Sequence, residues 1–209
     1  GDPAVEIGKA AERHGCDLIA MATHGRNLIT RGVLGSVTDK VLHSSSIPVL
    51  TVAPDAIGPD SELSTVVVPV DGSALSEFAL PYGEALARAM SLNMRLVRVV
   101  QIGWTYPYEI DFSNTHLENL EVEMVNDTTR YLRNVRAEQV SDDLDVEWKV
   151  LRGAPANALV ELARGDQHDI IVMSTHGRSG LSRWVLGSVT EAVARASRSP
   201  VLVIPPKAE

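Results

Sequence analysis

The chain has 209 residues, of which 44% are hydrophobic and 4% aromatic, and its formal net charge is −8. This length and composition allow a soluble globular protein with a sizeable core of aliphatic side chains. The negative charge argues against broad binding to the DNA or RNA backbone. The sequence shows no apolar stretch long enough for a membrane span and no signal-peptide profile at its start. The one cysteine, Cys16, cannot form an internal disulfide, so we expect a cytoplasmic protein.

Residues 1–54 predict the order helix, strand, helix, strand, with strands in DLIAMAT (17–23) and PVLTV (48–52). This segment is repeated at residues 153–206. In a gapless alignment, 24 of the 54 positions are identical. The agreement is strongest in THGR, VLGSVT and PVL.

The repeat predicts the domain organisation. Residues 1–54 correspond to the C-terminal half of a first unit, whose front half, about 90 residues in the other copy, we expect to be absent. Residues 55–63, DAIGPDSEL, read as a linker. A complete unit follows at 64–206.

The complete unit begins with TVVVPV (65–70), a β-branched run typical of a strand buried on both faces of a parallel sheet. Ser73 or Ser76 can cap the helix that runs through 77–90, where Pro81 delays or kinks it. MRLVRVVQI (94–102) predicts the second strand.

A long helix is predicted from His116, and then a third strand at 145–151. One face of that helix carries Leu117, Leu120, Met124, Thr128, Leu132 and Val135. A helix at 153–165, a strand at 169–175, a helix at 188–197 and a strand at 200–204 complete the unit. The alternation predicts an α/β fold with a doubly wound, five-stranded parallel sheet.

Two loops are candidates for a ligand site, because ligands of such sheets bind beyond the carboxyl ends of the strands. The loop after the fourth strand carries Gly177, which permits close backbone approach, and Gly187–Thr190, which open a helix whose free N–H groups attract phosphate. The hydroxyls of Ser188 and Thr190 can add donors. After the first strand, Asp71 can accept from a ribose hydroxyl or base amine, or help to hold a metal ion.

Each of these residues also has a structural interpretation. Gly187 and Ser188 can be an ordinary helix start, Asp71 a turn former, and His176 a loop residue bonded to the backbone. Arg178 and Arg183 are either solvated or reach phosphates. The functional hypothesis depends on two loops converging at one sheet edge, one of which occurs twice.

At these residues the chain resembles the universal stress protein family, whose nucleotide-binding members carry G-x2-G-x9-G-[ST] after the fourth strand. Ser174-x2-Gly177-x9-Gly187-Ser188 matches this spacing, as does Ala22-x2-Gly25-x9-Gly35-Ser36. In both copies a small residue replaces the first glycine. PVDGS after the first strand and PVLVIP near the end strengthen the resemblance.

The resemblance implies an adenine nucleotide alpha-hydrolase-like sheet ordered 3-2-1-4-5, with ATP, alone or with Mg²⁺, bound between strands one and four. By position, Pro69, Val70 and Asp71 then line the adenine and ribose, and Val99 touches the adenine. Met173, Ser174, His176 and Gly177 border the ribose and phosphates, and Gly187, Ser188, Val189 and Thr190 hold the phosphates. Family members occur as tandem units or dimers joined through antiparallel fifth strands.

Three functions remain open. The first is an ATP-binding regulatory protein of the stress response, with no catalytic residue, in which the nucleotide sets conformation or partner choice. The second is a slow ATPase or a relative of ATP pyrophosphatases, although PVDGSALS lacks the S-G-G-x-D-S loop expected of those enzymes. The third is a dimerisation module that binds no nucleotide.

The half unit generates two structural expectations. PVLTV pairs antiparallel with PVLVI of the complete unit, which anchors residues 1–54. DLIAMAT keeps an open sheet edge, which we expect to recruit a second chain into a homo-oligomer unless helices or loops cover it.

Overall fold

The computed structural model describes most of the chain. The described residues are 1–23, 34–54, 62–101, 114–165, 169–175 and 186–206. Side chains are described throughout these ranges except at residues 114–118.

Seven strands form one mostly parallel sheet in the order β1-β2-β7-β6-β3-β4-β5. The strands are β1 (Ile19–Ala22), β2 (Val49–Val52), β3 (Thr65–Pro69), β4 (Asn93–Val100), β5 (Val146–Arg152), β6 (Asp169–Ser174) and β7 (Val201–Ile204). Within the complete unit the order is β5-β4-β3-β6-β7, which confirms the predicted 3-2-1-4-5. The sheet as a whole is larger than the five strands expected, because β2 hydrogen-bonds to β7 and brings β1 with it.

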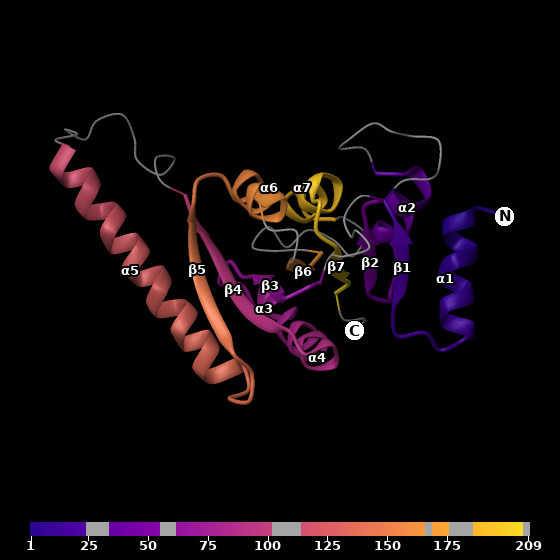
Figure 1. Ribbon diagram of the computed structural model, residues 1–209. Coiled ribbons are helices and arrows are strands. Elements are labelled where there is room, and N and C mark those ends of the chain that lie inside the picture. The colour runs from indigo at the N-terminus through magenta and orange to yellow at the C-terminus, as the bar shows by residue number, and fades with distance from the viewer. Residues whose placement is uncertain (24–33, 55–61, 102–113, 166–168, 176–185, 207–209) are drawn as a thin grey trace.

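Helices cover both faces of this sheet (Figure 1). They are α1 (Pro3–Arg13), α2 (Ser36–Ser44), α3 (Ala74–Glu77), α4 (Leu80–Met90), α5 (Asn114–Gln139), α6 (Pro155–Gly165) and α7 (Ser188–Ala196). In the part of the chain that the structure describes, no helix combines the length and the apolar character that crossing a membrane requires.

The helix after β3 is interrupted, as Pro81 predicted. Ser73 caps the short α3, with its hydroxyl oxygen accepting from the backbone N–H of Ser76. The chain then restarts as α4, with proline in the first turn. A proline there loses no helical hydrogen bond, since the N–H groups of a first turn have no partner within the helix.

Two apolar layers hold the fold together, one on each face of the sheet. On one face, α1, α2, α6 and α7 contribute side chains such as Ala11, Leu159 and Val193 to a core that includes Val67 and Ile171. On the other, Leu80 and Leu132 of α4 and α5 pack in the core that contains Val66 and Val68 of β3. Residues Val66, Val67 and Val68 have 0% exposure, so β3 is buried on both faces, as its β-branched run predicted.

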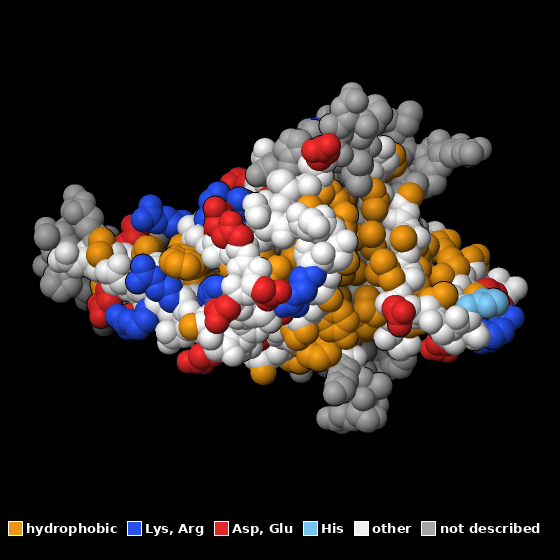
Figure 2. Space-filling model, turned by 60° about the horizontal axis from the view of Figure 1, so that its bottom comes forward, with side chains coloured by type: hydrophobic (Ala, Val, Ile, Leu, Met, Phe, Trp, Pro, Cys, Tyr) orange, Lys and Arg blue, Asp and Glu red, His pale blue; other side chains and the backbone are white. Residues whose placement is uncertain are grey.

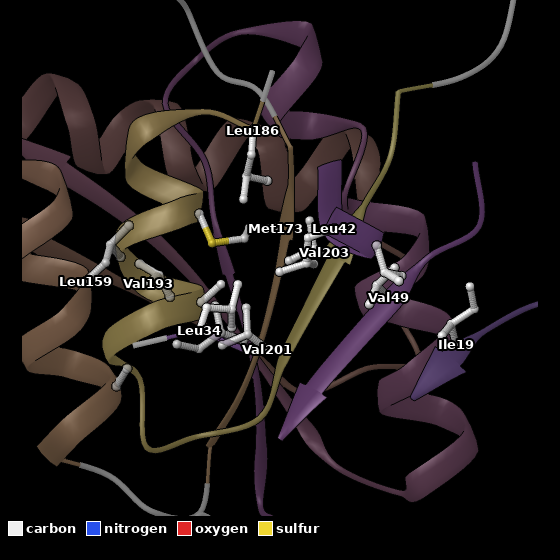
Figure 3. Close-up of a cluster of buried hydrophobic side chains, with 14 of the residues drawn as sticks. Ile19, Leu34, Leu42, Val49, Leu159, Met173, Leu186, Val193, Val201 and Val203 are labelled. Atoms are coloured by element: carbon white, nitrogen blue, oxygen red, sulfur yellow. The ribbon is translucent and has the colours of Figure 1, made fainter. Parts of the chain in front are cut away.

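Residues 1–54 join residues 64–206 through the predicted antiparallel pairing of β2 with β7. Val49 lies opposite Val203 and Leu50 opposite Leu202. Figure 3 shows Ile19 and Val49 in the same group of side chains as Val201 and Val203. The two segments therefore share one hydrophobic core.

One face of β1 and β2 is less covered than its counterpart in the complete unit. Ala20 and Ala22 are exposed, and Leu50 and Val52 are half-buried. Figure 2 shows hydrophobic side chains gathered in the middle of the molecule, whereas charged side chains crowd the end where α5 lies. In the described part of the chain β1 pairs with β2 alone, and the expected recruitment of a second chain stays a prediction.

Gly83 tests how closely α4 packs on β3. A Cβ added at Gly83 would lie 2.6 Å from Cγ2 of Val68, which is fully buried. We expect Gly83→Ala to lower the free energy of unfolding by about 1–3 kcal/mol, the usual cost of overpacking. Urea denaturation of both proteins measures the difference.

Gly8→Ala is the matched control. Gly8 lies inside α1, and an added Cβ would meet nothing within 4 Å. Alanine should therefore stabilise the chain by about 0.5–1 kcal/mol through helix propensity alone. Equal effects of the two substitutions would contradict the close contact between α4 and β3.

Candidate functional site

A cavity of about 570 Å³ opens at the carboxyl ends of β3, β4 and β6. It extends from the first turn of α7 on one face of the sheet to the middle of α5 on the other. β3 and β6 are neighbours in the sheet, but the chain leaves β3 toward α3 and leaves β6 toward α7. This is the switch point at which open α/β sheets bind ligands, and the volume is within the range of small-molecule sites.

The structure brings most of the predicted site residues together around this cavity. Those that line it are Pro69, Val70, Asp71, Val99, Met173, Ser174, Gly187, Ser188, Val189 and Thr190. His176 and Gly177 lie outside the described residues.

Asp71 occupies the turn that ends β3. Its Oδ1 accepts hydrogen bonds from the backbone N–H of Ser73 at 2.9 Å and from the Ser73 hydroxyl at 2.6 Å. Its own N–H donates to Oγ of Ser76 at 3.1 Å. Gly72 has φ +90°, a conformation that favours glycine, which explains the DGS sequence. Asp71 is thus a turn former, and it also lines the cavity.

The first turn of α7 faces the same cavity with its backbone. Among the described residues, no side chain caps the helix at Gly187, although the first N–H groups of any helix lack partners within it. Gly187 has φ −62° and ψ 143°, a conformation open to any residue. What glycine contributes at this position is therefore the absence of a side chain beside the helix terminus, where an anion is favoured.

The two predicted hydroxyl donors differ in their surroundings. The Thr190 hydroxyl donates to the Ser174 carbonyl at 2.8 Å and is buried, so it ties α7 to the end of β6. Ser188 lies at the first position of α7, against the cavity. The N–H of Gly187 donates to the Thr175 carbonyl at 2.6 Å, which fixes the helix start relative to the strand.

The first copy of the motif has the same local geometry. Gly35 precedes α2 with φ −60° and ψ 141°, again without a capping side chain. The Thr38 hydroxyl donates to the Ala22 carbonyl at 3.0 Å, and the Gly35 N–H donates to the Thr23 carbonyl at 2.7 Å. None of these residues lines the 570 Å³ cavity, however. In the described part of the chain, the first copy of the motif builds the same helix start but takes no part in this cavity.

Sequence reasoning missed the wall contributed by Arg98 and by α5. Arg98, next to the predicted Val99, lines the cavity, as do Asp127 and Thr128 of α5. Thr128 was expected only as part of an apolar packing face. The one available signal is the pair of arginines, Arg95 and Arg98, inside MRLVRVV, an otherwise apolar strand sequence.

The Arg98 guanidinium lies over the ring of Tyr131, 4.3 Å from its centroid. The Tyr131 hydroxyl donates to Oε1 of Glu77 at 2.6 Å. Burial, together with the hydrogen bond to the Glu77 carboxylate, raises the pKa of Tyr131 above its ordinary value. The hydroxyl therefore stays protonated and can remain a donor.

The described residues contain no group of three or more His, Cys, Asp or Glu side chains arranged to hold a metal ion. The acidic side chains of the cavity wall have protein partners. Asp71 accepts from Ser73, and Asp127 pairs with Arg130 at 2.9 Å. A divalent ion at this site would have to come with a ligand that supplies further oxygen atoms, as Mg²⁺ does with phosphates.

Comparison with known proteins identifies one family that matches most of the chain. The Universal stress protein family matches residues 1–53 and 62–205. The universal stress protein Rv2005c of Mycobacterium tuberculosis (strain ATCC 25618 / H37Rv) is 32% identical in an alignment of 209 positions, gaps included, that covers 95% of this chain and 63% of that protein. The universal stress protein MJ0577 of Methanocaldococcus jannaschii is 32% identical over 152 residues, covering 66% of this chain and 93% of that protein.

Solved structures agree as well. The structure of MJ0577 has a TM-score of 0.58 and 27% identity, covering 70% of this chain and 98% of its own. A universal stress protein from Archaeoglobus fulgidus DSM 4304 covers all of this chain and 68% of its own, with a TM-score of 0.63 and 24% identity, which shows a shared fold. The chain spans only part of the longer mycobacterial relative. With the family matched on both sides of residues 54–61, this chain belongs to the universal stress protein family.

Proposed function

We propose that this chain binds ATP in the cavity at the carboxyl ends of β3, β4 and β6, and that it acts as a regulatory protein of the stress response. The observation that carries the proposal is that the first turn of α7, which begins at a glycine, opens into the same cavity as Asp71. A helix N-terminus favours phosphate, and a carboxylate accepts from ribose hydroxyls. The proposal therefore assigns the phosphates to the first turn of α7 and the ribose to Asp71.

The predicted residues divide the cavity into two parts. Gly187, Ser188, Val189 and Thr190 are assigned to the phosphates, with Ser174 beside them. Pro69, Val70 and Val99 supply an apolar wall for the adenine, next to Asp71, and Met173 borders the ribose and phosphates. His176 and Gly177 belong to the same proposal through the sequence motif. Mg²⁺ would then be held mainly by phosphate oxygens.

A slow ATPase is the alternative in the enzyme class. Hydrolysis needs a group that activates water near the terminal phosphate. In the described wall the carboxylates belong to Asp71 and Asp127, which are engaged by Ser73 and Arg130. Phosphate release measured during ATP titration distinguishes this alternative from binding alone.

Gly187→Val tests the phosphate end. The backbone conformation at position 187 permits valine, so the fold should survive, whereas the branched side chain would stand where phosphate meets the helix. We expect ATP binding to be lost in isothermal titration calorimetry while the circular dichroism spectrum stays unchanged. A folded variant with undiminished ATP affinity would remove the phosphate assignment.

Gly35→Val is the matched control, because Gly35 has the same backbone geometry at the start of α2 but does not line the cavity. It makes the same chemical change to the same motif. ATP affinity should remain that of the original protein. If both variants lose binding equally, the effect lies in the fold and not in the site.

Asp71→Ala tests the ribose end. Removal of a carboxylate that accepts from the sugar should weaken ATP binding by about 1–3 kcal/mol. Asp71→Asn separates this role from the turn, because the amide oxygen can still accept from Ser73. Titration with 2′,3′-dideoxy-ATP completes the test. This analogue has no ribose hydroxyls, so the original protein and Asp71→Ala should bind it with equal affinity. An equal loss with both nucleotides would leave Asp71 as a turn residue only.

The geometry also predicts one strong ATP site per chain. The start of α2 matches that of α7, but the residues of 1–54 take no part in the cavity wall. ATP titration should give a stoichiometry near one, and phosphate release should be negligible over the same time. Two equivalent sites would contradict the assignment, fast turnover would favour the ATPase, and no binding would favour the dimerisation module.

A further inference from the structure

Arg98 is a charged residue on an otherwise apolar face of β4. Side chains alternate between the faces of a strand, so Arg98 shares its face with Met94 and Leu96. These two are fully buried against the core that α4 and α5 cover. Arg98 is half-buried and lines the cavity, and the buried Val100 follows it on the same face. This apolar face therefore carries one cation, and that cation lines the proposed ligand site.

A chain of contacts fixes the position of this cation. The guanidinium lies 4.3 Å from the centroid of the Tyr131 ring, an arrangement that is favourable and orients the planar group. The Tyr131 hydroxyl donates to Glu77 at 2.6 Å, and Nε2 of Gln139 donates to the other Glu77 oxygen at 2.8 Å. Tyr131 is thus held by α3 as well as by α5. Little side-chain freedom remains to be lost when Arg98 donates to a ligand.

Arg98 also lies on the side of the cavity away from α7, because β3 and β6 separate β4 from the start of that helix. The wall continues from α7 past the ends of β6 and β3 to β4 and then to α5. Among the described residues of this wall, Arg98 is the one with a cationic side chain. With phosphates at the first turn of α7, the far end takes the base, next to Val99 and Arg98.

The chemistry of arginine then constrains the base. A guanidinium has only donors, arranged as a fork. Guanine offers two adjacent acceptors, O6 and N7, which arginine can engage together. Adenine offers N7 beside an amino donor, a pair that suits the amide of glutamine or asparagine.

We propose that Arg98 is a specificity-determining residue that extends the ligand class of this site to guanine nucleotides, with GTP bound at least as tightly as ATP. The inference rests on the proposed nucleotide site. It does not require a change at the phosphate end, since the helix N-terminus binds the phosphates of either nucleotide. Arg98 acts through direct donation to the base, and Tyr131 acts as a positioning residue by holding the guanidinium.

The test is the ratio of the GTP and ATP dissociation constants, measured by calorimetry on the whole chain. The original protein should bind GTP at least as tightly as ATP. Arg98→Gln should shift the ratio toward ATP by about tenfold or more, because the new side chain matches adenine. Arg133→Gln is the matched control, since Arg133 lies over the ring of Trp148, outside the cavity wall, at 5.4 Å. It should leave the ratio unchanged.

A second variant separates recognition from a purely structural clamp. Tyr131→Leu removes the ring under Arg98, and the preference for GTP should fall while ATP binding persists. If Arg98 only joins β4 to α5, Arg98→Gln will lower the melting temperature and leave the ratio of the GTP and ATP dissociation constants unchanged, which overturns the inference.

ATP binding without GTP binding also overturns the inference about Arg98 but leaves the proposed function standing. GTP binding without ATP binding supports Arg98 and overturns the ATP assignment, whereas failure of both nucleotides overturns both proposals.

Discussion

The parallel pairing of β3 with β6 is the constraint on which the rest of the structure depends. Val66 and Val67 lie beside Ile170 and Ile171, and all four side chains are buried. From these neighbouring strands the chain turns to opposite faces of the sheet, toward α3 after β3 and toward α7 after β6. Two buried strands whose connections diverge leave an opening at their carboxyl ends. The cavity is thus a consequence of the strand order.

The same sheet links the site to the half unit. β6 pairs with β7, and β7 pairs with β2 of the first segment. Met173, which lines the cavity, packs in the cluster that also contains Val49 and Ile19 (Figure 3). Packed interiors transmit displacements because they contain few voids. One wall of the cavity therefore rests on a core to which residues 1–54 contribute.

Features that repeat locally could be predicted from the sequence. The β-branched run of β3 indicated a doubly buried strand, and the repeated Gly-Ser-Val-Thr indicated two helix starts. The chain order of elements then determined the strand order. Arg98 and Tyr131, by contrast, are brought together only by the packing of α5 on β4. No local sequence pattern predicts a contact between two such distant residues, which is why this wall of the site could not be predicted.

The two copies of the motif separate what a local sequence determines from what the fold adds. Gly35 and Gly187 start their helices with nearly identical dihedral angles, and Thr38 and Thr190 make the same hydrogen bond to the preceding strand. Local sequence is therefore sufficient for the helix start. Only beside α7, however, does the end of β3 add Asp71 and complete the cavity wall. A nucleotide needs contacts along its whole length, so the binding site is a property of the neighbouring strands, and the motif supplies one end of it.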